Sequence, residues 1–292
     1  MRILLYCPTY KVRSGELAMR NETQESITNL IIPEGVSVDV HVDAVNPLPH
    51  DGDRKNRHEN TLIKYRKARL EMLNGGYDAL LTIEHDMIIP EDAIEKMINT
   101  DADVVYGLYM FRHLKPIMNA LRTTTGRYID MSVSMFPEMI EKGKRQGWLK
   151  VSGAGFGCTL MHRRVLEKID FHRTKHGDVP IPDMPFAEDC VQNGFIQICR
   201  FDVQCGHIKP DGTVLWPFDK EGDAMNKVKI YVLRTFNANI GGKQQHFEAG
   251  TETEIEEEEA LDYVRAGYIG LVESKPAVKV VRKPNSKQKA VK

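Results

Sequence analysis

The chain has 292 residues, 41% hydrophobic and 28% charged, so it can bury a full core as one large domain with a small appendage. Its formal net charge of −1 gives the body of the protein no bulk attraction for nucleic acid or a membrane surface. No stretch approaches the roughly 18 apolar residues of a membrane-spanning helix. The five cysteines form no CxxC pair, so we expect free thiols and a cytoplasmic protein.

The first half of the chain alternates predicted strands and helices. Apolar runs and their spacing predict strands at 2–7, 36–42, 79–83 and 103–109, and helices at about 16–30, 61–73 and 90–99. This order predicts an α/β fold, a Rossmann-like, mainly parallel sheet with right-handed crossovers, flanked by helices. We expect a solvated face on the helix at 61–73, formed by its basic residues Lys64, Arg66, Lys67 and Arg69.

The pattern is weaker in the second half. Residues 111–150 are irregular, and the glycine-dense turn 153–157 precedes the apolar run 158–161. Closely spaced glycines allow backbone to approach a ligand, although a tight turn or bulge explains them equally well. Ile196 to Val203 is the last predicted core strand.

The composition changes near residue 240, so we predict a main domain at 1–235, a small α+β module at 240–274 and a basic tail at 275–292. Within the module we expect a hairpin at 247–255, a helix from the capping box of Thr253 and Glu256 to Ala266, and a strand at 268–272. The tail has seven basic side chains and no acidic one, so we expect a disordered segment that could contact DNA weakly.

The acidic residues of Glu84-His85-Asp86 directly follow the predicted strand 79–83. Ligands of open α/β sheets bind at the carboxyl ends of the strands. A carboxylate pair there can hold a divalent metal, and such a metal usually serves a diphosphate, although an acidic pair is also a common helix cap. The pattern therefore favours an enzyme that uses a nucleotide-sugar.

Residues 2–220 resemble the GT-A glycosyltransferases, nearest to family 2, because strand 2–7, residues 84–86, the glycine turn, Glu188-Asp189 and His207 occur in the family's order. The resemblance implies a nucleotide site, a metal site and a catalytic base. The matching residues are Pro8, Thr9, Tyr10 and Asp43 for the nucleotide, Asp86, Glu84 and His207 for the metal, and Asp189 or Glu188 for the base. The expected donor site also includes His85, which lies in the motif 84–86, Gly155, which lies in the glycine turn, and Arg57, which lies in the polar loop 46–60.

The chain departs from the family pattern in three places. The first acidic position is Glu84 where the family has Asp, and no QxxRW follows His207, so we do not expect a processive polysaccharide synthase. The interval from Asp189 to His207 is short, which predicts a trimmed helix after the acidic pair. The C-terminal module also resembles small modules of phage-encoded proteins.

The expected chemistry needs these residue types. A metal that bridges diphosphate oxygens stabilises the charge of the leaving group, and mixed carboxylate and imidazole ligands suit Mn²⁺ better than Mg²⁺. A carboxylate opposite the leaving group takes the proton of the acceptor hydroxyl, which predicts an inverting enzyme with Asp189 as the first choice of base. By resemblance the donor base is uridine and the sugar glucose or N-acetylglucosamine, whereas nothing specifies a glycan, protein or modified DNA acceptor.

Two other functions stay open. A sugar nucleotidyltransferase would need a glycine-rich, basic loop after the first strand, but residues 7–15 contain one glycine. A non-catalytic carbohydrate-binding or scaffold protein could use the same fold, because a fold does not fix a function.

Overall fold

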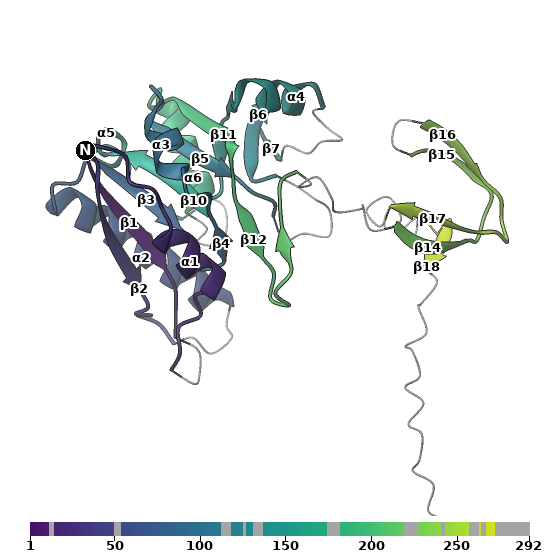
Figure 1. The fold of residues 1–292 in the computed structure, drawn as a ribbon, viewed down its shortest axis with the longest axis horizontal. Coiled ribbons are helices and arrows are strands. Elements are labelled where there is room, and N and C mark those ends of the chain that lie inside the picture. The colour runs from purple at the N-terminus through teal and green to yellow at the C-terminus, as the bar shows by residue number, and fades with distance from the viewer. Residues whose placement is uncertain are drawn as a thin grey trace, which may run out of the picture. The chain divides into compact units, whose positions relative to one another are not determined.

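The computed structural model describes residues 1–11, 15–49, 54–111, 118–124, 127–130, 137–173, 182–218, 227–240, 243–256, 263 and 267–271. The chain divides into two compact units, Met1–Lys220 and Glu221–Lys292 (Figure 1). In the described residues no helix is long and apolar enough to cross a membrane.

The first unit is built on a seven-stranded sheet. Its strands, in spatial order, are β2 (Ser37–Asp43), β1 (Arg2–Pro8), β3 (Ala79–Ile83), β10 (Cys158–His162), β5 (Val104–Leu108), β11 (Gln197–Gln204) and β8 (Trp148–Lys150). Strands β2, β1, β3, β5 and β11 run in one direction, whereas β10 and β8 run in the other. The predicted α/β fold with a mainly parallel sheet is therefore confirmed.

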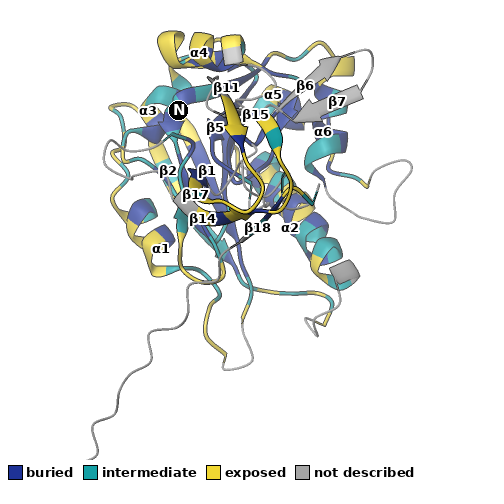
Figure 2. Ribbon diagram, turned by 90° about the vertical axis from the view of Figure 1, so that its right-hand side faces the viewer, coloured by how far each residue is buried: buried dark blue, intermediate teal, exposed yellow. Residues whose placement is uncertain are grey.

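Helices cover both faces of this sheet because side chains alternate along each strand. Leu4 and Tyr6 of β1 pack into the core on one side, and Ile3 and Leu5 pack into the core on the other. The first core is completed by α2 (Arg54–Asn74), α4 (Pro137–Gln146), α5 (Arg163–Leu166) and α6 (Asp183–Gln192), and the second by α1 (Asn21–Thr28) and α3 (Ala93–Ile98). Figure 2 shows the central strands in the buried colour and the outer faces of α1 and α4 in the exposed colour.

Two small sheets complete the first unit. One contains β4 (Met87–Ile88), β12 (Gly206–Ile208) and β13 (Val214–Leu215), and the other β6 (Ala120–Thr124), β7 (Arg127–Asp130) and β9 (Gly153–Ala154). The segment 111–150, irregular by sequence, thus contributes β6, β7, α4 and β8.

Of the two helices that carry predicted site residues, α2 differs from the sequence-based expectation and α6 agrees with it. Helix α2 begins at Arg54, inside the predicted polar loop, and its buried stripe uses Ala68 and Met72 while Leu70 is 54% exposed. Helix α6 begins at Asp183 and extends past Asp189 to Gln192. Only Cys190, Val191 and Gln192 of α6 follow Asp189, so the prediction of a trimmed helix after the acidic pair is confirmed.

All five cysteines belong to the first unit, and all are buried free thiols, as expected. Burial raises the pKa of the Cys7 thiol to about 12 and raises those of Cys190 and Cys199 as well. Thiolates, which are the reactive forms, are therefore scarce at these three cysteines in the folded protein.

The second unit is described in part. Its β14 (Lys227–Val232) pairs with β17 (Glu252–Glu256) and β18 (Ile269–Leu271), and β15 (Phe236–Ile240) forms a hairpin with β16 (Lys243–Phe247). This division begins the second unit before the predicted boundary at 235, and among the described strands β14 pairs with β17 and β18, which both follow it. Residues 253–256 form a strand where the capping box predicted a helix, and the hairpin precedes the expected 247–255. The tail 275–292 lies outside the described residues.

Candidate functional site

The carboxyl ends of β1, β2 and β3 meet at one edge of the sheet, since the three strands are parallel neighbours. A cavity of about 260 Å³, called here the Lys64 cavity, lies at this edge. Seven residues predicted from the sequence line it: Pro8, Thr9, Tyr10, Arg57, Glu84, His85 and Asp86. Helix α2 and the loop before it add four more residues to the lining, Asn46, Asn60, Thr61 and Lys64.

The prediction of a solvated face on α2 is correct for Arg66 and Lys67, which are exposed, and wrong for Lys64, which is buried. Lys64 is only 4% exposed and donates a hydrogen bond to the Thr9 carbonyl, and burial lowers the pKa of its ammonium. The other three residues bind protein groups too: Arg66 donates to the carbonyl of Phe171 at 2.7 Å, Arg69 to that of Leu166 at 2.7 Å, and Lys67 to the carboxylate of Asp43 at 2.8 Å. Helix α2 is therefore fixed to the loops on either side by its cations.

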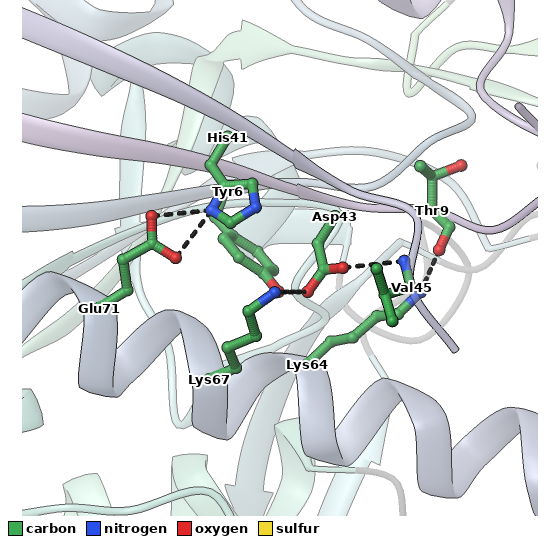
Figure 3. A network of polar contacts seen from close by, with 8 residues as sticks. All are labelled: Tyr6, Thr9, His41, Asp43, Val45, Lys64, Lys67 and Glu71. Atoms are coloured by element: carbon green, nitrogen blue, oxygen red, sulfur yellow. Dashed lines mark hydrogen bonds and ion pairs between the residues drawn. The ribbon is translucent and has the colours of Figure 1, made fainter. Parts of the chain in front are cut away.

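Asp43 lies at the end of β2 and is 2% exposed (Figure 3). Its Oδ2 accepts from Tyr6 Oη at 2.5 Å and from Lys67 Nζ at 2.8 Å, and its Oδ1 accepts from the Val45 amide at 3.0 Å. Burial by itself would raise the pKa of Asp43, but these hydrogen bonds outweigh it and hold the pKa below its ordinary value. The structure thus places Asp43 in a polar network with internal partners and outside the lining of the Lys64 cavity.

Asp86 and His207 are brought together from distant parts of the sequence by the pairing of β4 with β12. His207 Nε2 lies 3.8 Å from Asp86 Oδ1, and the two residues are 6% and 3% exposed. His207 Nδ1 donates to the Met110 carbonyl at 2.7 Å, which orients the ring and leaves Nε2 toward Asp86. Two ligands at about 2.2 Å from one metal can be up to about 4.4 Å apart, so this pair fits a divalent cation.

Glu84, the third predicted ligand, is not part of a metal-like cluster. Within the described ranges, no group of three His, Cys, Asp or Glu side chains is arranged to hold a metal. A divalent metal bound through two protein ligands takes its remaining ligands from substrate phosphates and water. The pair of Asp86 and His207 is therefore suited to a metal that binds together with a diphosphate.

A second cavity of about 260 Å³, called here the Tyr65 cavity, adjoins the first. Thr61 and Glu84 line both cavities, and the other lining residues are His58, Tyr65, Phe156, Pro182 and Asp183. Asp183 is half-buried at the first position of α6, and burial raises the pKa of its carboxyl to about 6. A carboxyl of this pKa beside a cavity can hold or accept a proton near neutral pH.

The sequence analysis did not single out Asp183. The sequence does contain a signal for a helix that starts at Asp183. Phe186 and Cys190 are apolar and four residues apart, as on one face of a helix, and Pro182 and Asp183 precede them as residues typical of a helix start. The predicted bases lie further along α6, where Asp189 accepts a hydrogen bond from His172 Nε2 at 2.7 Å. In the described part of the chain, neither Glu188 nor Asp189 lines either cavity.

Gly155 has a packing reason for being glycine. A Cβ added to it would lie 2.2 Å from Tyr109 Oη, and a Cβ added to Gly157 would lie 2.8 Å from the Tyr109 ring. The glycine turn therefore makes room for a buried tyrosine next to the cavities, and Gly155 lines neither of them within the described residues.

A larger cavity of about 470 Å³ lies between α1 and the strands β1 and β2. Apolar side chains, including Met19, Ile27 and Val40, dominate its lining, and no charged residue of the described chain contributes. Among its described lining residues, this cavity has no group that could transfer a proton at neutral pH or bind a metal.

No protein-family model and no curated protein matches this sequence. Solved structures with a similar fold include the protein A197 from STIV, with a TM-score of 0.45 and 17% identity over 77% of this chain and 99% of that one. They also include the inositol-1-phosphate CTP transferase from T. maritima (TM-score 0.40, 12% identity, 73% and 91%) and the mannose-1-phosphate geranyltransferase from Thermus thermophilus (0.32, 11%, 70% and 75%). At these identities and TM-scores, the similarity concerns the fold alone.

Proposed function

We propose that this protein transfers a sugar from a nucleotide-sugar to an acceptor hydroxyl, with a divalent metal and inversion at the anomeric carbon. One observation carries the proposal: Glu84 lies between two adjoining cavities, one beside the Asp86 and His207 pair and the other beside Asp183. A metal-assisted leaving group and a base are thus available on neighbouring walls of one site.

The Lys64 cavity would take the nucleoside diphosphate. Arg57 and Lys64 contribute positive charge to its lining, and Thr9 and Tyr10 supply the loop at the end of β1. Asp86 and His207 would hold Mn²⁺ or Mg²⁺, which when bound stabilises the negative charge of the departing diphosphate. Uridine is the base we expect from the resemblance, and glucose or N-acetylglucosamine the sugar.

The Tyr65 cavity would take the transferred sugar and the incoming hydroxyl. Asp183 is our first choice for the group that accepts the hydroxyl proton, because it lines this cavity and its pKa of about 6 leaves it ionised at pH 7 yet basic enough to accept a proton. Asp189, which accepts a hydrogen bond from His172, becomes the second choice.

The test has a binding arm and a turnover arm. We expect UDP to raise the melting temperature of the wild type more with Mn²⁺ than without it, and Asp86→Ala to lose the Mn²⁺-dependent part. Hydrolysis or transfer of UDP-glucose should fall about 10²-fold or more in Asp183→Asn and change little in Glu188→Gln, the matched control on the same helix. A folded wild type that binds no nucleoside diphosphate, with or without metal, would instead support the non-catalytic alternative.

A further inference from the structure

Tyr65 is a polar residue of the site that the proposed chemistry does not use. It lies on α2, is 1% exposed and lines the second cavity. Its hydroxyl is buried and has no hydrogen-bond partner among the described residues. A buried hydroxyl without a partner costs free energy, so its presence in a cavity wall needs a reason.

The position of the Tyr65 ring is fixed by aromatic packing. Its centroid lies 5.1 Å from that of Phe156 and 5.5 Å from that of Phe171. Burial raises the pKa of the Tyr65 hydroxyl well above its usual value, and the negative charges of Glu84 and Asp183 raise it further. Glu84 and Asp183 line the same cavity as Tyr65, and the raised pKa keeps the Tyr65 hydroxyl protonated, as a donor.

The cavity is large enough for more than water. Its volume of about 260 Å³ is several times the ~30 Å³ that one water occupies in the liquid. The lining includes both a hydrogen-bond donor, the hydroxyl of Tyr65, and hydrogen-bond acceptors, the carboxylates of Glu84 and Asp183. Such a lining complements a compact group that carries several hydroxyls.

We propose that Tyr65 is a specificity-determining residue whose hydroxyl donates a hydrogen bond to one hydroxyl of the transferred sugar. The inference rests on the proposed function, and it adds that the donor carries a hydroxyl at the position facing Tyr65. A site built to bond a substrate hydroxyl rejects the analogue that lacks it, because the protein group is then left buried and unpaired.

The experiment compares UDP-glucose with UDP, both with Mn²⁺, on the full chain by calorimetry. In Tyr65→Phe we expect the affinity for UDP-glucose to fall about tenfold and the affinity for UDP to stay unchanged. Tyr106→Phe is the matched control, since Tyr106 is equally buried but its hydroxyl donates to Gln197 at 2.7 Å. Tyr106→Phe should leave the preference for UDP-glucose over UDP unchanged and lower the stability of the free protein, whereas Tyr65→Phe should not lower it.

A second measurement uses UDP-glucose analogues that each lack one ring hydroxyl. For one analogue, the affinity of the wild type should be about tenfold lower than its affinity for UDP-glucose. Tyr65→Phe should bind this analogue and UDP-glucose with equal affinity. The hydroxyl missing from this analogue is then the one that accepts the hydrogen bond of Tyr65. Equal loss of UDP and UDP-glucose affinity, or none of either, in Tyr65→Phe would overturn the inference alone. Failure of the wild type to bind both ligands would overturn the proposed function and this inference with it.

Discussion

Replacing Asp183 with Asn is expected to make the protein more stable and inactive at the same time. Burial raises the pKa of this carboxyl from 3.8 to about 6, so its charged form is less favourable in the folded chain than in the unfolded chain. The stability that Asp183 contributes is therefore fully present below pH 3.8 and is lost as the pH rises through about 6. Asn has the same shape, keeps the acceptor for the Met184 amide, and carries no charge to desolvate.

The structure sets the size of the effect. A pKa difference of about 2.2 corresponds to about 3 kcal/mol. Because the side chain is half-buried, solvent screens part of this cost, and we expect Asp183→Asn to gain about 1–2 kcal/mol at pH 8. At pH 4 the two proteins should differ little, because the wild-type carboxyl is protonated in the folded state.

Urea unfolding of both proteins from pH 4 to pH 8 measures this difference. Both tryptophans, Trp148 and Trp216, lie in the first unit, so their fluorescence follows the unfolding of the unit that contains Asp183. Subtraction of the two curves removes the titration of every other group. A difference that does not change between pH 4 and pH 8 would refute the reasoning, since it would mean that Asp183 titrates alike in the folded and unfolded chains.

Three further predictions follow from the contacts of the site. The pH profile of kcat/KM for UDP-glucose should rise through about pH 6 with Asp183 as the ionising base, and a profile that stays flat from pH 5 to 7 would contradict this role. Gly155→Ala should cost about 1–3 kcal/mol in urea unfolding, because its Cβ would lie 2.2 Å from Tyr109 Oη, and Tyr109→Phe in the same chain should recover part of the loss. Lys67→Met should cost about 1–3 kcal/mol at pH 7 by leaving the buried Asp43 carboxylate without its cation. The cost of Lys67→Met should shrink as the pH falls below 3.8. The pKa of Asp43 is lowered in the folded state, so the stabilisation by its carboxylate is lost as the carboxyl protonates. A cost of Lys67→Met that is the same at pH 3 as at pH 7 would show that the ion pair is not its cause.

The sequence was sufficient for those parts of the fold that depend on local apolar pattern. The strand predicted at 79–83 is β3 residue for residue, since a short apolar run buried on both faces has clear limits. The position of Glu84 and Asp86 at the sheet edge followed from that strand. The start of α2 could not be predicted in the same way, because its first turns are polar and read as a loop.

Features that depend on distant contacts were beyond local pattern. Lys64 reads as a solvated helix residue, yet the end of β1 supplies a buried carbonyl for it, and the sequence separation of 55 hides that pairing. Residues 253–256 of β17 were predicted to start a helix, although 247–255 was also predicted as a hairpin, because a capping-box spacing is local whereas the pairing with β14 is not. Asp183 was not predicted as the base, because the base was assigned by resemblance to an acidic pair of the family, which matches Glu188-Asp189.

Because the thiols are buried, their rate of alkylation can be used to measure how often the folded first unit opens. Cys7, Cys158, Cys190, Cys199 and Cys205 all lie in the first unit, so a small alkylating reagent can modify them only when that unit opens. Under conditions where closing is faster than alkylation, the labelling rate is proportional to the population of the open form. Mass spectrometry of the labelled wild-type chain would then measure the opening free energy of the first unit in mixtures and lysates, while the second unit, which has no cysteine, adds no signal.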